Sequence, residues 1–263
     1  MQGGYEELRL IASRISSEAA SLLRDRFCEP SMAKRISGET MRADKISEDY
    51  IIEALLKEGL EVTIVSEEAG IRGSGDLIAL IDPLDGSINY VNCIPWAAVS
   101  IAFGRRLDGK DVIVAGSVAP IFNEPPLSFA LGKGCYRGGT RIREPPKRDS
   151  EIIAVYVDNK EAADMIARLD SVIRDYKLRS LGSASLELSY VGLGLIEAFM
   201  DLRARLRNID VAAAQGIIRE CGGYIVNSDG RELMVPLKPI KKLGKIIATR
   251  NKKLLKIILN SII

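Results

Sequence analysis

Histidine is absent from the whole chain of 263 residues. Its absence excludes Ser-His-Asp and Cys-His catalysis, phosphohistidine chemistry and zinc sites that need histidine ligands. Any general acid, general base or metal ligand must therefore come mainly from Asp and Glu side chains. Because ligand sets made only of oxygen suit hard cations, the composition favours Mg²⁺, Mn²⁺ or Ca²⁺ as a bound ion.

Long apolar runs and a strong net charge are also missing. No stretch approaches the roughly eighteen apolar residues that suggest a membrane span. The acidic N-terminus, MQGGYEELRL, lacks the positive region and apolar core of a secretory signal. The formal net charge of +2 gives no electrostatic reason to expect nucleic acid as a partner. We therefore expect a cytoplasmic protein that binds neither membranes nor nucleic acid.

Cysteine is scarce and scattered along the chain. The four cysteines are Cys28, Cys93, Cys135 and Cys221, and they form no CxxC pair. Scattered cysteines in a cytoplasmic chain are typically reduced. We predict that all four are reduced and that most have a structural role.

Apolar patterns in the first half of the chain predict two helices and a sheet. A helical stripe covers residues 5–27, and a second helix is expected from about Ser47 to Lys57, where Gly59 stops it. Short apolar runs follow at 62–65, 77–81, 98–103, 112–118 and 127–131. Together these runs predict one substantial sheet that packs against the two helices.

A change in composition separates the first half from the second. The segment 138–150, GGTRIREPPKRDS, is rich in Gly, Pro and charge and is a plausible boundary. Beyond it, strands are expected at 152–157, 196–201, 224–227 and 245–249, and helices at 160–174, in SASLELSYVGLG, at 210–221 and at the C-terminus. The alternation predicts an α/β layered protein with two sheets, divided into an N-terminal part (1–145) and a C-terminal part (146–263).

Acidic residues recur where apolar runs end and where helices are expected to begin. They are Asp44, Glu67, Glu68, Asp82, Asp85 and Asp210. Each of them alone is typical of a turn or of the first turn of a helix. Their shared placement is more informative, because α/β proteins bind ligands at the ends of strands and the starts of helices.

If these acids lie close together in the folded chain, cations are expected between them. If folding brought Glu67, Asp82, Asp85 and Asp210 together, their repulsion would be costly unless metal ions neutralised it. Two divalent ions roughly 3.5–4 Å apart need a shared carboxylate and flanking ones, which the spacing of Asp82 and Asp85 can supply. The following Gly86-Ser87 pair can offer backbone N–H groups to an anion. The combination describes a site for phosphate-ester hydrolysis.

Four segments also match a known family in the right order. DPLDGSINYV resembles the DP-(I/L)-DG-(S/T)-x-N signature of the inositol monophosphatase and fructose-1,6-bisphosphatase superfamily, including its prokaryotic dual-activity members. VSEEAG resembles the Glu-Glu motif of that superfamily, RSLGSASLELSYVGLG its R-x-x-G-(S/T)-A segment and IDVAAAQGIIRECGG its W-D-x-A-A-G motif. The resemblance implies an αβαβα sandwich and a metal-dependent phosphatase.

The resemblance implies roles for particular residues. The metal ligands would be Glu67, Asp82, Asp85, Asp210 and the backbone carbonyl of Leu84, which places most of them in the N-terminal part. The catalytic residues that position or activate the attacking water would be Asp44, Glu67, Glu68 and Ser87, with Asp44 near a third metal site. Asp85, Gly86, Ser87, Ser183, Asp201 and Arg203 would bind the substrate. Two or three Mg²⁺ ions are implied, with Mn²⁺ as a substitute, and a homodimer or homotetramer.

The chain departs from the family pattern at four places. Ile209 replaces the usual Trp, Ala214 a common Gly, and Ser87 the commoner Thr. DKISED (44–49) keeps only the first acid of the D-x-V-T-x-x-D segment. None of these changes removes a predicted metal ligand.

Arg203 suggests a substrate with two phosphates. The stretch FMDLRARLRNID carries Asp201 nine residues before Asp210 and brings Arg203, Arg205 and Arg207 close to the predicted site. Strand alternation would aim Asp201 and Arg203 to one side, while Arg205 and Arg207 are expected to be solvated or paired with acids. Since a guanidinium matches a phosphate with paired donors, we predict hydrolysis of fructose 1,6-bisphosphate at its 1-phosphate and of inositol 1-phosphate.

Three other functions fit parts of the sequence. Cys135 and Arg141 satisfy the C-x-x-G-x-x-R loop of thiolate phosphatases, but Pro145 and Pro146 work against the long helix that this loop needs. A nucleotide 3′-phosphatase of the same superfamily is an alternative with the same metal site. A non-enzymatic regulatory member is another, although such a protein is expected to have lost some of these acids.

Overall fold

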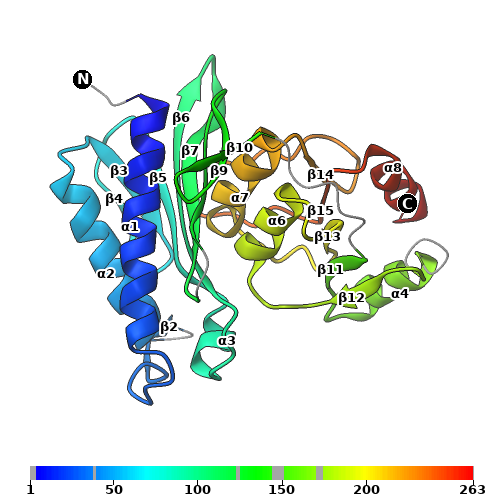
Figure 1. Ribbon diagram of the computed structural model, residues 1–263, viewed down its shortest axis with the longest axis horizontal. Helices are drawn as coiled ribbons and strands as arrows, with labels where there is room; N and C mark the ends of the chain where they lie inside the picture. Colours follow the sequence, from blue (N-terminus) through cyan, green and yellow to red (C-terminus); the bar gives the residue numbers. More distant parts are fainter. Residues whose placement is uncertain (1–3, 38–39, 123–124, 144–150, 170–173, 263) are drawn as a thin grey trace.

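Two mixed sheets and three layers of helices make up the computed structural model of the chain, which describes residues 4–37, 40–122, 125–143, 151–169 and 174–262. The helices are α1 (Tyr5–Asp25), α2 (Arg42–Lys57), α3 (Ser87–Val91), α4 (Lys160–Arg168), α6 (Ala184–Gly192), α7 (Asn208–Glu220) and α8 (Lys252–Ile262). Figure 1 shows the layers in order: α1 and α2, the first sheet, α6 and α7, the second sheet, and α4 with α8 on the outside. The predicted αβαβα sandwich is confirmed.

The first sheet has eight strands in the order β10-β9-β8-β7-β6-β5-β3-β4. Its strands are β3 (Val62–Ser66), β4 (Gly70–Arg72), β5 (Leu77–Asp85), β6 (Ala98–Leu107), β7 (Lys110–Pro120), β8 (Leu127–Ala130), β9 (Gly134–Arg137) and β10 (Thr140–Ile142). Only β3 and β5 pair in parallel, and a small separate hairpin is formed by β1 (Arg35–Ser37) and β2 (Thr40–Met41) among the described residues. The central strands are continuous apolar runs because helices cover both of their faces.

The second sheet has five strands in the order β12-β11-β13-β15-β14. They are β11 (Ile152–Tyr156), β12 (Lys177–Arg179), β13 (Ala198–Asp201), β14 (Tyr224–Asn227) and β15 (Ile246–Thr249). β11 pairs in parallel with β12 and β13, whereas β15 runs antiparallel to β13 and β14. Phe129 of the first sheet and Phe199 of the second belong to one buried cluster with α6 and α7, so the two sheets share the core between them.

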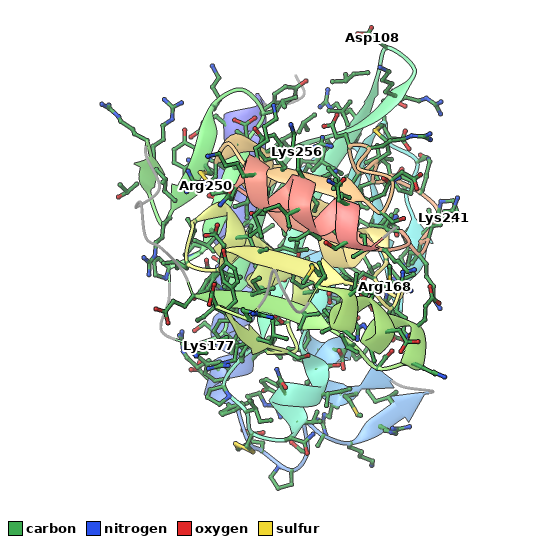
Figure 2. The ribbon with its side chains drawn as sticks, turned by 90° about the vertical axis from the view of Figure 1, so that its right-hand side faces the viewer. Asp108, Arg168, Lys177, Lys241, Arg250 and Lys256 are labelled. Carbon is green, nitrogen blue, oxygen red and sulfur yellow. A yellow bond between two sulfur atoms is a disulfide. The ribbon has the colours of Figure 1, made fainter. Side chains whose placement is uncertain are left out.

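The outer face of the second sheet is covered by α8 and α4. Figure 2 views this face and shows Lys256 on α8 with Arg250 before it, and Lys241 and Arg168 towards its edge. Leu254, Leu255 and Ile258 of α8 pack inward. No helix in the described part of the chain is long and apolar enough to cross a membrane.

Several predicted element bounds are wrong in ways that matter for the site. The second helix begins at Arg42 rather than near Ser47, so Asp44 lies in its first turn instead of before it. The helix expected at 160–174 ends at Arg168, and 170–173 lie outside the described residues, as do 144–150 of the expected boundary segment. Strand β5 continues through Pro83 to Asp85, so the two aspartates do not form a turn.

The prediction of reduced cysteines is also wrong. Cys28 is bonded to Cys93, and Cys135 to Cys221. The partners are 65 and 86 residues apart in sequence, and only the fold brings them together. Cys135 also lies in β9, which turns directly into β10 rather than into a helix. A thiolate phosphatase loop at Cys135 is therefore excluded, because the sulfur is bonded to Cys221 and the next element is β10, not a helix whose N-terminus could lower the pKa of a thiol.

Candidate active site

The last residues of β5 carry two of the predicted ligands into the layered core. Asp82 pairs with Ser100 and Asp85 with Ala98 on β6, and the register between the two pairs is irregular because Pro83 cannot donate a ladder hydrogen bond. The Pro83 carbonyl accepts a hydrogen bond from the Ser47 hydroxyl of α2 at 2.7 Å. The irregular segment is therefore fixed from the side of the first helical layer, and both carboxylates are at most 9% exposed.

Asp85 accepts four hydrogen bonds from the start of α6. The hydroxyls of Ser183 and Ser185 lie 2.6 Å from its Oδ2, and the backbone N–H groups of Ser185 and Ala184 donate at 2.7 and 3.2 Å. Burial raises the pKa of Asp85, while these hydrogen bonds work in the opposite direction. Ser183, which we predicted to bind substrate, is fully buried, and its hydroxyl donates to a predicted metal ligand.

Asp210 lies in the first turn of α7 and contacts Arg207. Its Oδ2 accepts the Arg207 backbone N–H at 2.8 Å, and its Oδ1 lies 3.0 Å from Nη2 of the same residue. Arg207 also reaches across the site, where its Nη1 lies 2.5 Å from Oε1 of Glu67 at the end of β3. Arg207 therefore pairs with acids, one of the two outcomes expected from the sequence, and the acids that it joins are two of the predicted metal ligands.

The acids influence one another strongly. Burial raises the pKa of Asp82 well above its ordinary value, and the charges of Asp85 and Asp210 raise it further. Burial also raises the pKa of Asp210, although Arg207 opposes the shift. Carboxylates that raise each other's pKa in a buried site are stabilised when a cation is bound between them.

The donor set suits a hard divalent ion. Asp82, Asp85, Asp210 and the buried Leu84 carbonyl offer only oxygen, which Mg²⁺ and Mn²⁺ prefer. Within the described residues, however, no three acidic or cysteine side chains are placed to hold an ion as they stand. The guanidinium of Arg207 lies between Glu67 and Asp210 and supplies positive charge there.

Asp44 faces the loop that carries Glu67 and Glu68. Its pKa is raised to about 7 by burial and by the charges of these two glutamates, against a hydrogen bond from the Met41 N–H. A second acid of α2, Glu48, is fully buried and organises the same loop. Its Oε1 accepts the Ser66 hydroxyl and the N–H groups of Glu68 and Ala69.

Glu48 was missed at the sequence level. When DKISED is aligned with the D-x-V-T-x-x-D segment of the family, Asp44 matches the first acid, and Glu48 falls on a position where the family pattern has no acid. Its position four residues after Asp44 is informative only when the helix begins at Arg42, because residues at this spacing then lie on the same face.

Gly86 makes the turn between β5 and the short helix α3. Its φ of 87° lies in the left-handed region, and a Cβ there would meet the carbonyl oxygens of Trp96 at 3.0 Å and Gly182 at 3.2 Å. Only glycine fits this position without strain. Ser87 begins α3 directly after Gly86 and is half-buried, so both residues follow the buried Asp85 in the chain.

Asp201 and Arg203 form a paired unit at the end of β13. Asp201 is fully buried, and its Oδ1 accepts both the N–H and the Nε of Arg203 at 3.1 and 2.8 Å. The guanidinium of Arg203 lies 4.3 Å above the ring of Tyr156. Asp201 therefore orients Arg203 rather than presenting a carboxylate to solvent.

Tyr156 links this unit to α6. Its hydroxyl donates to Oε1 of Glu187 at 2.5 Å, and the Gly182 N–H donates to the same oxygen at 2.9 Å. Burial raises the pKa of Glu187 to about 7. Neither residue was predicted as part of the site, because the sequence analysis gave 152–157 only as a strand and SASLELSYVGLG only as a helix.

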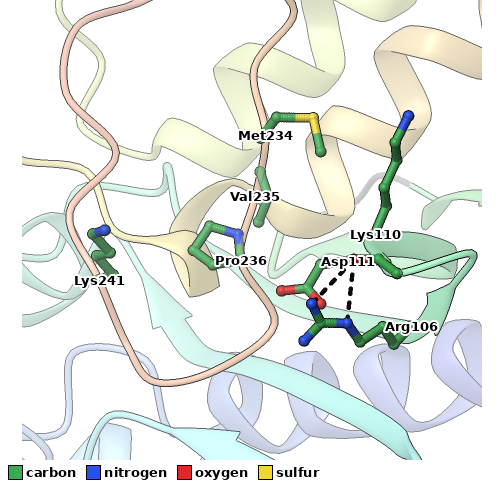
Figure 3. A pocket seen from close by; sticks show the side chains of 8 residues that line it. Arg106, Lys110, Asp111, Met234, Val235, Pro236 and Lys241 are labelled. Carbon is green, nitrogen blue, oxygen red and sulfur yellow. Dashed lines mark hydrogen bonds between the residues drawn. The ribbon is translucent and has the colours of Figure 1, made fainter.

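A separate cavity lies away from these acids. Figure 3 shows its lining side chains, with Arg106 and Asp111 of the β6–β7 hairpin on one side and Val235 and Pro236 on the other. Its volume is about 420 Å³. The cavity shares no residue with the carboxylate site.

Fold and site together define a layered α/β protein in which buried carboxylates from β5 and α7 influence one another close to the left-handed turn at Gly86. The model of the inositol monophosphatase family matches residues 5–262, and the chain therefore belongs to this family of metal-dependent phosphatases.

Known proteins resemble the chain over nearly its whole length. An inositol-1-monophosphatase of Aeropyrum pernix is 48% identical over 259 residues, 96% of each chain. A fructose-1,6-bisphosphatase/inositol-1-monophosphatase of Thermococcus kodakarensis is 32% identical over 265 residues, 99% of this chain and 98% of the relative. A solved inositol monophosphatase–fructose 1,6-bisphosphatase superposes with a TM-score of 0.81 at 28% identity, covering 95% of this chain and 98% of that structure.

Proposed function

We propose that the protein hydrolyses inositol 1-phosphate and the 1-phosphate of fructose 1,6-bisphosphate in a Mg²⁺-dependent reaction. The observation that carries the proposal is the buried set of Asp82, Asp85 and Asp210 next to the Gly86 turn. The names of the relatives support both substrates, with inositol 1-phosphate named for the 48% identical protein and both for the 32% identical one.

Five oxygen donors would hold the ions in this proposal: the carboxylates of Glu67, Asp82, Asp85 and Asp210 and the carbonyl of Leu84. Two or three Mg²⁺ ions would bind, and Mn²⁺ would substitute. When bound, such ions lower the pKa of water and stabilise a leaving alkoxide. The four hydrogen bonds to Asp85 keep that carboxylate aimed at the site before an ion arrives.

The residues around the ligands position the reactants. Glu67, Glu68 and Asp44 lie together and would orient the attacking water from one side. The N–H groups at Gly86 and Ser87 would hold the phosphate, since a turn in the left-handed region directs successive amides towards an anion. No side chain in this set would be phosphorylated during turnover.

Arg203 would distinguish a bisphosphate from a monophosphate. Asp201 holds its Nε and the Tyr156 ring supports its guanidinium, so the side chain is partly ordered before substrate binds. The side chain is 21% exposed; its Nη1 lies 3.9 Å from Oδ2 of Asp158, and its Nη2 would be presented to a second phosphate. In this proposal Asp201 positions Arg203 and does not itself contact the sugar.

Comparing kcat/KM for both substrates in the wild type and in Arg203→Ala tests the substrate assignment. A loss confined to fructose 1,6-bisphosphate is expected, because only that substrate carries a second phosphate. Arg205→Ala is the matched control, since Arg205 pairs with Asp158 at 2.8 Å and is 59% exposed. Equal losses on both substrates would exclude Arg203 as the specificity residue.

The organisation of the molecule is part of the same proposal. The N-terminal part (1–145) would supply most ligands, and the C-terminal part (146–263) the last ligand and the substrate contacts. We further propose a cytoplasmic homodimer or homotetramer, which light scattering of the purified protein would test.

A further inference from the structure

We propose that Arg207 is the internal counter-cation of the metal-free site: its guanidinium holds Glu67 and Asp210 until a divalent ion displaces it, and it thereby sets the affinity for the ion. The inference rests on the proposed metal site. It adds to that site a positive group of the chain itself that competes with the metal.

The contacts place Arg207 between acids from opposite sides of the site. Its Nη1 lies 2.5 Å from Oε1 of Glu67, which follows β3. Its Nη2 lies 3.0 Å and its Nε 3.2 Å from Oδ1 of Asp210 in α7. One rigid fork therefore spans the two carboxylates, a geometry that arginine supports and lysine does not.

The positive charge of Arg207 offsets part of the repulsion among the buried acids. Asp82, Asp85 and Asp210 are each at most 9% exposed, and their negative charges act on one another. Arg207 stabilises the ionised forms of Asp82 and Asp210. The neighbouring arginines are engaged elsewhere, Arg203 with Asp201 and Arg205 with Asp158. Without Arg207 the metal-free acids would repel one another with less compensation.

A divalent ion and the Arg207 guanidinium compete for the same carboxylate oxygens. Glu67 and Asp210 are the two ligands that Arg207 contacts, so binding of the ion must break or weaken these ion pairs. The free energy lost when these ion pairs break reduces the observed binding free energy of the ion, because that binding free energy is the difference between the ion-bound protein and the protein in which the pairs are intact. Arg207 therefore weakens metal binding while it stabilises the metal-free protein.

The backbone next to Arg207 is fixed, so its side chain is the part free to move. The Asn208 N–H donates to the Lys241 carbonyl at 3.0 Å, and the Lys241 N–H donates to Oδ1 of Asn208 at 2.9 Å. Nδ2 of Asn208 donates to the Pro236 carbonyl at 2.8 Å. Figure 3 shows Pro236 and Lys241 on the loop that makes these contacts. Displacement of Arg207 requires rotation of its side chain and leaves α7 in place.

Calorimetric titration of Mn²⁺ and of Mg²⁺ into EDTA-treated full-length protein tests the proposal. Arg207→Gln is expected to bind the ions about tenfold more tightly than the wild type, which corresponds to about 1.4 kcal/mol. Its melting temperature in EDTA should fall below that of the wild type, and the added stability from saturating Mg²⁺ should be larger. Arg205→Gln removes the same charge two residues away without touching a ligand and should show neither change.

The outcomes separate this proposal from the metal site on which it rests. Unchanged or weaker ion binding by Arg207→Gln would overturn the role of Arg207 and leave the metal site standing. No ion binding by the wild type would overturn the metal site itself, and the proposal with it. If Arg207→Gln does not fold in EDTA, Arg207→Lys replaces it, because a lysine can pair with only one of the two acids. An affinity above that of the wild type is then expected, and an equal or lower one would contradict the proposal.

Discussion

Substituting Ser183 by Ala distinguishes two roles for this residue. The sequence resemblance assigns Ser183 to the substrate, whereas its hydroxyl donates to Oδ2 of Asp85 at 2.6 Å in the structure. The side chain does not cap α6 by a hydrogen bond to the backbone, so loss of a helix cap does not contribute to the effect. Only the bond to Asp85 is removed.

The expected cost follows from the charge of the acceptor. A hydrogen bond to an ionised group contributes about 1.5–3 kcal/mol, and we expect a loss of about 2 kcal/mol for Ser183→Ala. In a chain of this size, about 2 kcal/mol lowers the melting temperature by roughly 4–8 °C. Thermal unfolding in EDTA at pH 8, where Asp85 is more fully ionised, measures it. The ion affinity should fall as well, since Asp85 loses one of the groups that aim it.

Ser189→Ala is the matched control. Ser189 is also buried in α6, but its hydroxyl donates at 2.6 Å to the Ser185 carbonyl, a neutral backbone acceptor. It should cost about 1 kcal/mol or less and leave ion binding unchanged. A Ser183→Ala protein with wild-type melting temperature and ion affinity but a raised KM would refute the structural assignment and restore the substrate role.

Two further predictions concern the acids and the cysteines. In EDTA, the protein should lose stability as the pH rises from about 4 towards 7. Carboxyl groups whose pKa is higher in the folded than in the unfolded protein stabilise the fold only while they are protonated. The pH window follows from the raised pKa values of Asp82, Asp85 and Asp210 and from that of Asp44, which is about 7. Melting temperatures measured at several pH values should fall less steeply with pH when Mg²⁺ is saturating. An equally steep fall with Mg²⁺ would argue against ion binding at these groups. Thiol titration of the denatured protein without reductant should find no free cysteine, because Cys28 is bonded to Cys93 and Cys135 to Cys221. Reduction should release four thiols. Four thiols without reductant would contradict the pairing.

The sequence predicts the layers well because burial leaves a local signature. Runs such as LIALI in β5 are apolar throughout, since helices cover both faces of the first sheet. The aspartates that follow it were harder to place. Asp-Pro and Asp-Gly favour a turn locally, but pairing with β6 and the hydrogen bond from Ser47 keep the segment in the sheet.

Contacts between distant segments account for what the sequence could not predict. The ion pair of Arg207 with Glu67 joins α7 to the end of β3, and no local pattern relates them. The disulfides likewise depend on the packing of separate elements. The resemblance implies that Asp201 binds the substrate, and no local pattern predicts that the N–H groups of Arg203, Arg205 and Leu206 donate to its oxygens.

The phosphatase site itself is tested most directly by phosphate release from inositol 1-phosphate as Mg²⁺ is added back to EDTA-treated enzyme. The wild type should release no phosphate without the ion and recover turnover with it. Asp82→Asn should stay inactive, by orders of magnitude, at every Mg²⁺ concentration, because the shared carboxylate charge is lost. Asp229→Asn, a change at an exposed acid far along the chain, should behave as the wild type. Near wild-type turnover of Asp82→Asn at saturating Mg²⁺ would contradict the account.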